Sequence, residues 1–224
     1  MTNPNLIIRQ VEVGPMANFI YLIGDAASAE VFAVDPAWET DAILDIAGKE
    51  RFTIIGIILT HGHFDHCNGV AELLALKNMP VYINKTEAAF MRGFQGANGI
   101  FGVLPDKGLR ELGNGESIHA GKTELRFLHT PGHSPGSQCI LAGGALITGD
   151  TLFTGSIGRC DLPGSDPGNM YESLSEVIAK LPDDTSIYPG HNYSGKTSSS
   201  IGDEKNGNPY LACKSLDEFL KLVA

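Results

Sequence analysis

The segment THGHFDHCNG (residues 60–69) places three histidines and one aspartate within six consecutive positions. These residues are His61, His63, Asp65 and His66. Imidazole nitrogens and carboxylate oxygens are common protein ligands of zinc and of non-haem iron. A polar loop is the alternative, but three of the chain's seven histidines would then share this short segment by chance. The spacing therefore predicts a metal site.

Three later segments each carry one further side chain of a metal-ligand type. HTPGHSPGS places His133 on a turn rich in glycine and proline, directly after an expected strand. ALITGDTL carries Asp150 after an apolar run, and SIYPGHN carries His191 in the same way. A single aspartate after a strand is most often a turn or capping residue. Four strand ends that each deliver a ligand type instead predict one shared site.

Apolar runs and turn residues predict the elements that would position these ligands. Strands are expected at 6–13, 18–25, 30–36, 52–59, 80–84, 116–119, 123–129, 137–142, 145–149 and 185–189. Helices are expected at 39–50, 69–78, 85–94, 169–181 and 215–223, with Thr40 and Ser215 as N-caps. The glycine-rich stretch 95–115 predicts a loop or lid. Because no linker separates the two batches of strands, we expect one α/β domain over residues 1–224, with two stacked sheets covered by helices.

The set T-H-x-H-x-D-H, P-G-H, G-D and P-G-H, in this order, resembles the metallo-β-lactamase superfamily over nearly the whole chain. The resemblance implies an αββα sandwich of two mixed β-sheets flanked by helices, with metals at one edge. It also implies a first metal held by His61, His63 and His133. A second metal would be held by Asp65, His66 and His191, with Asp150 bridging the two.

Further motifs distinguish branches of this superfamily. GDTLFTGSIGRCDLPG and MYESLSEVIAKLPDDT resemble the hydroxyacylglutathione hydrolase (glyoxalase II) group. The chain departs from that group at residues 160–162, where Cys-Asp-Leu replaces an aromatic pair. GRCDL and the tail HNYSGKTSSSIGDEKNGNPYL resemble the persulfide dioxygenase group, which uses one iron. True β-lactamases, nucleases and diiron partners of flavoproteins fit these motifs less well.

The resemblance implies a metal-dependent hydrolase that cleaves a thioester, such as S-lactoylglutathione or a related acyl-thiol, with a metal-bound hydroxide. The expected cofactors are two divalent metal ions, which could be zinc, iron or manganese. The alternative is a glutathione persulfide dioxygenase with one Fe(II). Asp65 is the expected catalytic residue, because its carboxylate can orient the hydroxide as well as bind a metal.

Residues near the ligands supply candidates for substrate binding. Arg159 could bind a substrate carboxylate through two hydrogen bonds, with a structural salt bridge as the alternative. Tyr193 and Lys196 lie just beyond His191 and are expected near the mouth of the cleft. Asp35, in the segment VDP, is expected to fix the tautomer of a ligand imidazole.

Composition limits the partners and the compartment. The net charge of −10 argues against a nucleic-acid surface, which normally carries a basic stripe. The four cysteines are scattered, the N-terminus does not resemble a signal peptide, and no apolar run is long enough to span a membrane. We therefore expect a cytoplasmic protein, as a monomer or homodimer. The resemblance implies that it acts on a small thiol ester, with glutathione as one candidate thiol.

Overall fold

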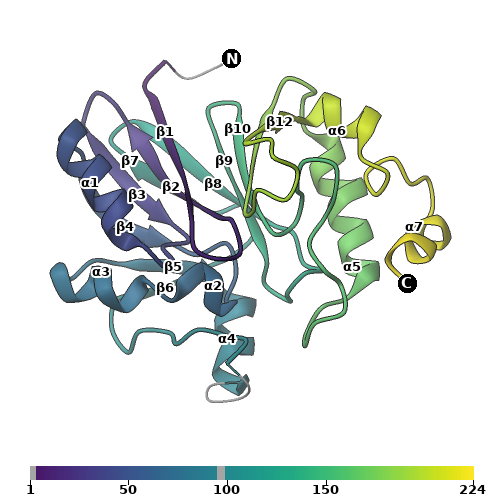
Figure 1. Cartoon of the computed structure of the whole chain (residues 1–224), viewed down its shortest axis with the longest axis horizontal. Coiled ribbons are helices and arrows are strands. Elements are labelled where there is room, and N and C mark those ends of the chain that lie inside the picture. Colours follow the sequence, from purple (N-terminus) through teal and green to yellow (C-terminus); the bar gives the residue numbers. More distant parts are fainter. Residues whose placement is uncertain (1–3, 95–98) are drawn as a thin grey trace.

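Two β-sheets stack face to face in this chain, and helices cover the outer face of each (Figure 1). The computed structural model describes residues 4–94 and 99–224. Both sheets are mixed, because each contains parallel as well as antiparallel neighbours. The predicted αββα sandwich is therefore confirmed.

The first sheet has the strand order β1-β2-β3-β4-β5-β6. Its strands are β1 (Leu6–Val13), β2 (Asn18–Asp25), β3 (Glu30–Val34), β4 (Thr53–Ile58), β5 (Val81–Asn84) and β6 (Leu109–Leu112). Neighbours from β3 to β6 are parallel, and parallel strands need crossover connections. The helices in these connections are α1 (Thr40–Glu50), α2 (Phe64–Cys67), α3 (Val70–Leu76) and α4 (Lys85–Phe94).

The second sheet has the strand order β12-β11-β10-β9-β8-β7. Its strands are β7 (Ser117–Ala120), β8 (Thr123–His129), β9 (Gln138–Ala142), β10 (Ala145–Gly149), β11 (Ser186–Pro189) and β12 (Ser199–Ser200). The helices on its outer face are α5 (Pro167–Glu172), which continues as a π-helical turn (Ser173–Val177) and a 3₁₀ turn (Ile178–Lys180), α6 (Ile201–Gly207) and α7 (Leu216–Val223). In Figure 1 these helices lie on the side opposite α1.

Strand β2 shows how the sequence builds two adjoining core layers. All eight of its residues are buried. Ile20 and Leu22 belong to the core between the first sheet and its helices, whereas Phe19, Tyr21 and Ile23 belong to the core between the sheets. Because successive side chains of a strand point to opposite faces, a continuous apolar run is what a strand covered on both faces requires.

The stretch predicted as a loop or lid, 95–115, is only partly a loop. Residues 95–98 lie outside the described residues, and β6 falls within the stretch and pairs in parallel with β5. The four residues of β6 do not alternate between buried and exposed, so no period-2 pattern marked them as a strand. The prediction of a loop is therefore wrong for β6.

The helix ends agree with the prediction in one case and differ in two. Ser215 caps α7 as predicted, since its side chain accepts a hydrogen bond from the backbone of Glu218. Thr40 is not an N-cap; it is the buried first residue of α1, after Glu39. The helix expected from 169 begins at Pro167, because Asp166 provides the cap.

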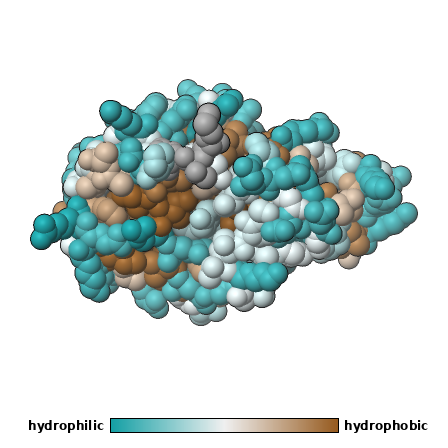
Figure 2. All heavy atoms as spheres, turned by 90° about the horizontal axis from the view of Figure 1, so that it is seen from above, coloured by the Kyte–Doolittle hydropathy of each residue, from teal (hydrophilic) through white to brown (hydrophobic). Residues whose placement is uncertain are grey.

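Seen from above, the rim of the molecule is largely hydrophilic, and the largest hydrophobic area lies on the side of the first sheet (Figure 2). None of the helices in residues 4–94 and 99–224 is long and apolar enough to cross a membrane.

Candidate metal centre

Strand ends at one edge of the sandwich each lead into a predicted metal ligand. Asp150 directly follows β10, His191 lies two residues after β11, and His133 lies in the loop after β8. These three strands run in the same direction, since β9 is antiparallel to β8 and β10, and β10 is parallel to β11. Their carboxyl ends therefore meet, and His61, three residues after β4, faces them from the other sheet.

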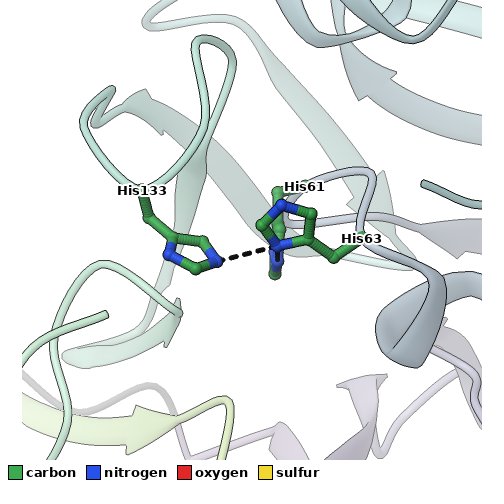
Figure 3. A group of neighbouring side chains, drawn as sticks. All are labelled: His61, His63 and His133. Carbon is green, nitrogen blue, oxygen red and sulfur yellow. Dashed lines mark hydrogen bonds between the residues drawn. The ribbon is translucent and has the colours of Figure 1, made fainter. Parts of the chain in front are cut away.

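Three imidazoles form the first cluster (Figure 3). His63 Nδ1 lies 3.0 Å from His61 Nε2 and 2.9 Å from His133 Nε2. All three side chains are buried. The structure thus brings together the residues expected to hold one metal.

The second cluster consists of Asp65, His66 and His191. Asp65 and His66 lie on the short helix α2, which turns the chain sharply after His63. The Nε2 atoms of His66 and His191 are 3.1 Å apart, and Asp65 Oδ2 lies 3.5 Å from each. These are the residues expected to hold the second metal.

Asp150 lies between the two clusters. Its Oδ2 is 3.5 Å from His133 Nε2 in the first cluster and 3.3 Å from His191 Nε2 in the second. Its Oδ1 is 3.3 Å from His66 Nε2. Its two oxygens thus lie near ligands of both clusters, and the bridging role stays a prediction.

Carbonyl oxygens fix the tautomers of two of these imidazoles. His133 Nδ1 lies 2.9 Å from the carbonyl oxygen of Arg159, and His191 Nδ1 lies 2.9 Å from that of Met16. A carbonyl can only accept a hydrogen bond, so Nδ1 carries the hydrogen in both rings. The lone pair of each Nε2 therefore points into its cluster.

Asp35 fixes two further imidazoles, one directly as predicted and one through Thr60. His66 Nδ1 donates to Asp35 Oδ2 at 3.0 Å. Thr60 donates both its backbone N–H and its hydroxyl to Asp35, so the hydroxyl accepts from His61 Nδ1 at 3.0 Å. Asp35 has a left-handed φ of 48°, a strained conformation for a residue other than glycine that these hydrogen bonds help to hold.

The resulting arrangement of lone pairs fits metal ions. The lone-pair nitrogens of His61 and His133 both face His63 Nδ1, which can donate to only one of them. The second cluster has two such nitrogens 3.1 Å apart, beside two carboxylates. Lone pairs and negative charges this close repel unless a cation lies among them. Within each cluster the ligand atoms all lie within 4.8 Å of one another.

Burial keeps the imidazoles of the first cluster neutral. It lowers the pKa of His61 and His133, and lowers that of His63 to about 3. Burial opposes ionisation of Asp150, but the facing imidazoles of His191 and His66 hold its pKa well below the ordinary value. Neutral imidazoles and ionised carboxylates are the forms that bind metals.

Two residues that the sequence did not single out hold Asp65 in place. Asn18 Nδ2 donates to Asp65 Oδ2 and to its carbonyl oxygen, both at 3.0 Å. Trp38 Nε1 donates to Asn18 Oδ1 at 3.0 Å. Because an indole can only donate, this contact turns the amide nitrogen of Asn18 towards Asp65. In the sequence Asn18 is only a polar residue at the start of an expected strand, so no signal marked its role.

A cavity of about 500 Å³ opens over the metal centre and reaches Asp65, Asp150 and the ligand histidines His63, His133 and His191. Its other walls are mostly apolar or aromatic and include Trp38, Phe64, Ile100, Phe153, Ile157 and Leu162. The cavity therefore pairs a polar floor with walls suited to an apolar group.

The three predicted substrate-binding residues differ in position. Arg159 lines the cavity, but its exposed side chain pairs with Asp161 through two hydrogen bonds of 2.8 Å. Tyr193 also lines the cavity and stacks on His191, with ring centroids 4.7 Å apart. Lys196 is exposed and is not among the described residues that line the cavity, so the structure does not bring it to the site.

Comparison with known families gives the same assignment as the motifs. The family model described as the metallo-beta-lactamase superfamily matches residues 13–191. The chain belongs to the metallo-β-lactamase superfamily. The matched segment contains all the histidines and aspartates of the two clusters.

Relatives within the superfamily carry different activities. The probable polyketide biosynthesis zinc-dependent hydrolase BaeB of Bacillus velezensis is 31% identical over 204 residues, covering 91% of this chain and 86% of its own. A hydroxyacylglutathione hydrolase of a Polaromonas species is 34% identical over 193 residues, covering 84% and 67%. The mouse mitochondrial persulfide dioxygenase ETHE1 is 30% identical over 223 residues, covering 97% and 80%. Both the hydroxyacylglutathione hydrolase group and the persulfide dioxygenase group are therefore homologous to this chain.

Solved structures of the superfamily share this fold. ETHE1 from Myxococcus xanthus superposes with a TM-score of 0.83 at 31% identity, covering 97% of this chain and 89% of its own. TTHA1623, solved in a di-iron-bound form, superposes with a TM-score of 0.77 at 31% identity, covering 90% and 99%.

Proposed function

We propose that this protein is a metal-dependent hydrolase of thioesters, with S-lactoylglutathione or a related acyl-thiol as substrate. The observation that carries the proposal is the pair of complete ligand clusters with Asp150 between them. The two hydrolases among the relatives support the reaction type. The cofactors would be two divalent ions of zinc, iron or manganese, and the di-iron form of TTHA1623 supports a pair of metals.

In hydrolysis, the residues on the floor of the cavity and those in its walls would have different roles. The two clusters would hold two metal ions, and a bound divalent metal supplies a water whose pKa is about 7, which is a nucleophile at neutral pH. Asp65, fixed by Asn18, would orient that nucleophile through a hydrogen bond to its carboxylate. The apolar walls would bind the acyl group and exclude bulk water.

Arg159 would recognise the thiol carrier. It lines the cavity, and its guanidinium could exchange Asp161 for a substrate carboxylate, because an exposed ion pair is weak. Glutathione carries such carboxylates, but so do other thiols. The proposal therefore includes acyl-thiols other than glutathione thioesters.

Arg159→Ala should raise KM about ten- to a hundredfold for a substrate that carries a carboxylate, with little change in kcat, because the contact would be the same in the ground and transition states. Steady-state kinetics against a carboxylate-free acyl-thiol supplies the comparison, for which KM should not change. The melting temperature should hardly move, since the pair with Asp161 is exposed. An unchanged KM for both substrates would show that Arg159 does not contact the substrate.

A glutathione persulfide dioxygenase with one Fe(II) is the second candidate. The similarity to mouse ETHE1 favours it, because the match extends over 97% of this chain. The two complete clusters favour the hydrolase but do not exclude the dioxygenase, since the first cluster alone could hold one iron.

A side-by-side assay under air separates the two functions. Zinc-loaded and iron-loaded samples receive S-lactoylglutathione or glutathione persulfide, and thiol release and oxygen consumption are recorded. The hydrolase proposal expects thiol release from the thioester and no oxygen uptake with the persulfide. Oxygen uptake by the iron-loaded sample, with thioesters left intact, would overturn it in favour of the dioxygenase.

A further inference from the structure

Glu87 carries a buried carboxylate that is not part of the cavity lining. The residue lies in the first turn of α4 and is 0% exposed. Its Oε1 accepts a hydrogen bond from Gly62 N at 2.8 Å. Its Oε2 accepts from Gly136 N at 2.7 Å and from Ser134 Oγ at 2.8 Å. One carboxylate thus accepts hydrogen bonds from three neutral donors.

These donors belong to the two loops that supply the first cluster. Gly62 lies between His61 and His63, and Ser134 directly follows His133. The loops come from different sheets, because one follows β4 and the other follows β8. A side chain on a third element, α4, therefore joins the two halves of the cluster.

Both loops approach α4 closely, and the loop after β8 needs glycine where it meets the backbone of the helix. A Cβ added at Gly136 would lie 2.2 Å from Glu87 N, and one added at Gly62 would lie 2.3 Å from Met91 Sδ. Burial raises the pKa of Glu87, although its hydrogen bonds oppose the shift. A buried carboxylate without a cationic partner is unfavourable unless its acceptors are satisfied, so apolar packing alone does not explain a glutamate here.

We propose that Glu87 is a positioning residue that sets the spacing of His61, His63 and His133, and thereby the metal affinity of the first cluster. No hydrogen bond among the described residues joins Glu87 to the second cluster. Its loss should therefore affect one cluster and not the other. The proposal rests on metal binding by the clusters, and not on which reaction the protein catalyses.

Zinc affinity tests this, measured in the full-length chain by competition with a chromophoric chelator and without substrate. A His191→Ala background removes a ligand of the second cluster, so the titration reports the first. A His133→Ala background reports the second in the same way. Glu87→Gln should weaken zinc binding about 10- to 100-fold in the first background and less than about threefold in the second.

Asp25 offers a matched control at the other end of β2 from Asn18. Its buried carboxylate also accepts hydrogen bonds from backbone amides, including those of Ala27 and Ser28, and from the Thr123 hydroxyl. Asp25→Asn should leave zinc affinity unchanged in both backgrounds, even where the melting temperature falls. Unchanged affinity in Glu87→Gln, or equal weakening by Asp25→Asn, would overturn the proposal.

Ser134→Ala keeps the test decisive if Glu87→Gln does not fold. It removes one of the three hydrogen bonds to Glu87 and leaves the carboxylate in place. Zinc binding by the first cluster should weaken about 3- to 10-fold, and binding by the second should not change. Unchanged binding by the first cluster would contradict the proposal. Because no substrate is present, failure of the thioester assay does not affect this result.

Discussion

Asp65→Ala should lower kcat about 100- to 10,000-fold even at saturating metal, the range typical for loss of a group that handles the proton of a nucleophile. The expectation follows from the position of Asp65, whose Oδ2 lies within 3.5 Å of His66 and His191 and is fixed by Asn18. Steady-state kinetics over a metal titration measures it.

The matched control for this experiment is Asp217→Ala, which removes an exposed carboxylate on α7 and should leave kcat unchanged. Metal content must be measured for each sample, because Asp65 also belongs to the second cluster. If excess metal alone restores near wild-type turnover to Asp65→Ala, the carboxylate is only a ligand and does not orient the nucleophile.

Asp150→Ala should have a comparable effect by a different route, since Asp150 contacts both clusters through His133, His66 and His191. Without the Asp150 carboxylate, no negatively charged ligand lies between His133 of the first cluster and the imidazoles of His66 and His191 in the second. Metal content after desalting should fall from close to two ions per chain to one or fewer, and kcat/KM should fall more than about 100-fold. Elemental analysis and kinetics on the same sample measure both quantities.

Asp41→Ala, which removes an exposed carboxylate in the first turn of α1, should retain the wild-type metal content. The metal content of the wild-type protein provides the second comparison. A metal content that never rises above one ion per chain, after incubation with zinc, manganese or iron, would rule out the two-metal site and favour the dioxygenase.

The clustered side chains could be predicted because their positions depend on local sequence. His61, His63 and His66 share one short segment after an apolar strand, so a single turn suffices to gather them. His133 and Asp150 each follow a strand in a segment with its own turn residues. Strands that run in the same direction then bring such segments to one edge, whatever the details of packing.

The residues that hold those side chains in place could not be predicted in the same way. Asn18 contacts a residue 47 positions away, and Glu87 contacts residues 25 and 49 positions away. In the sequence each resembles an ordinary polar residue at the start of a strand or helix. Only the packing of the sheets and of α4 determines which buried donor meets which acceptor, and no local pattern records that choice.

The shortest elements escaped prediction for a related reason. β12 has two residues and is defined by its pairing with β11, so there is no room for a hydrophobic period. Helix α6 follows it directly and carries a Ser200 cap that hydrogen-bonds to the backbone of Asp203. The cap was a usable signal, but a seven-residue helix shows too little periodicity to stand out from a polar loop.

Each cluster draws its ligands from segments that lie far apart in the sequence. The first needs His133 in addition to His61 and His63, and the second needs His191 in addition to residues 65 and 66. During synthesis residues 61–66 emerge first. The first cluster is completed by His133, after β8, whereas the second is completed only by His191, after β11. The two ligand sets therefore become complete one after the other, and a chain that has not yet reached His191 offers the cell's metal pool only an incomplete, weaker second set.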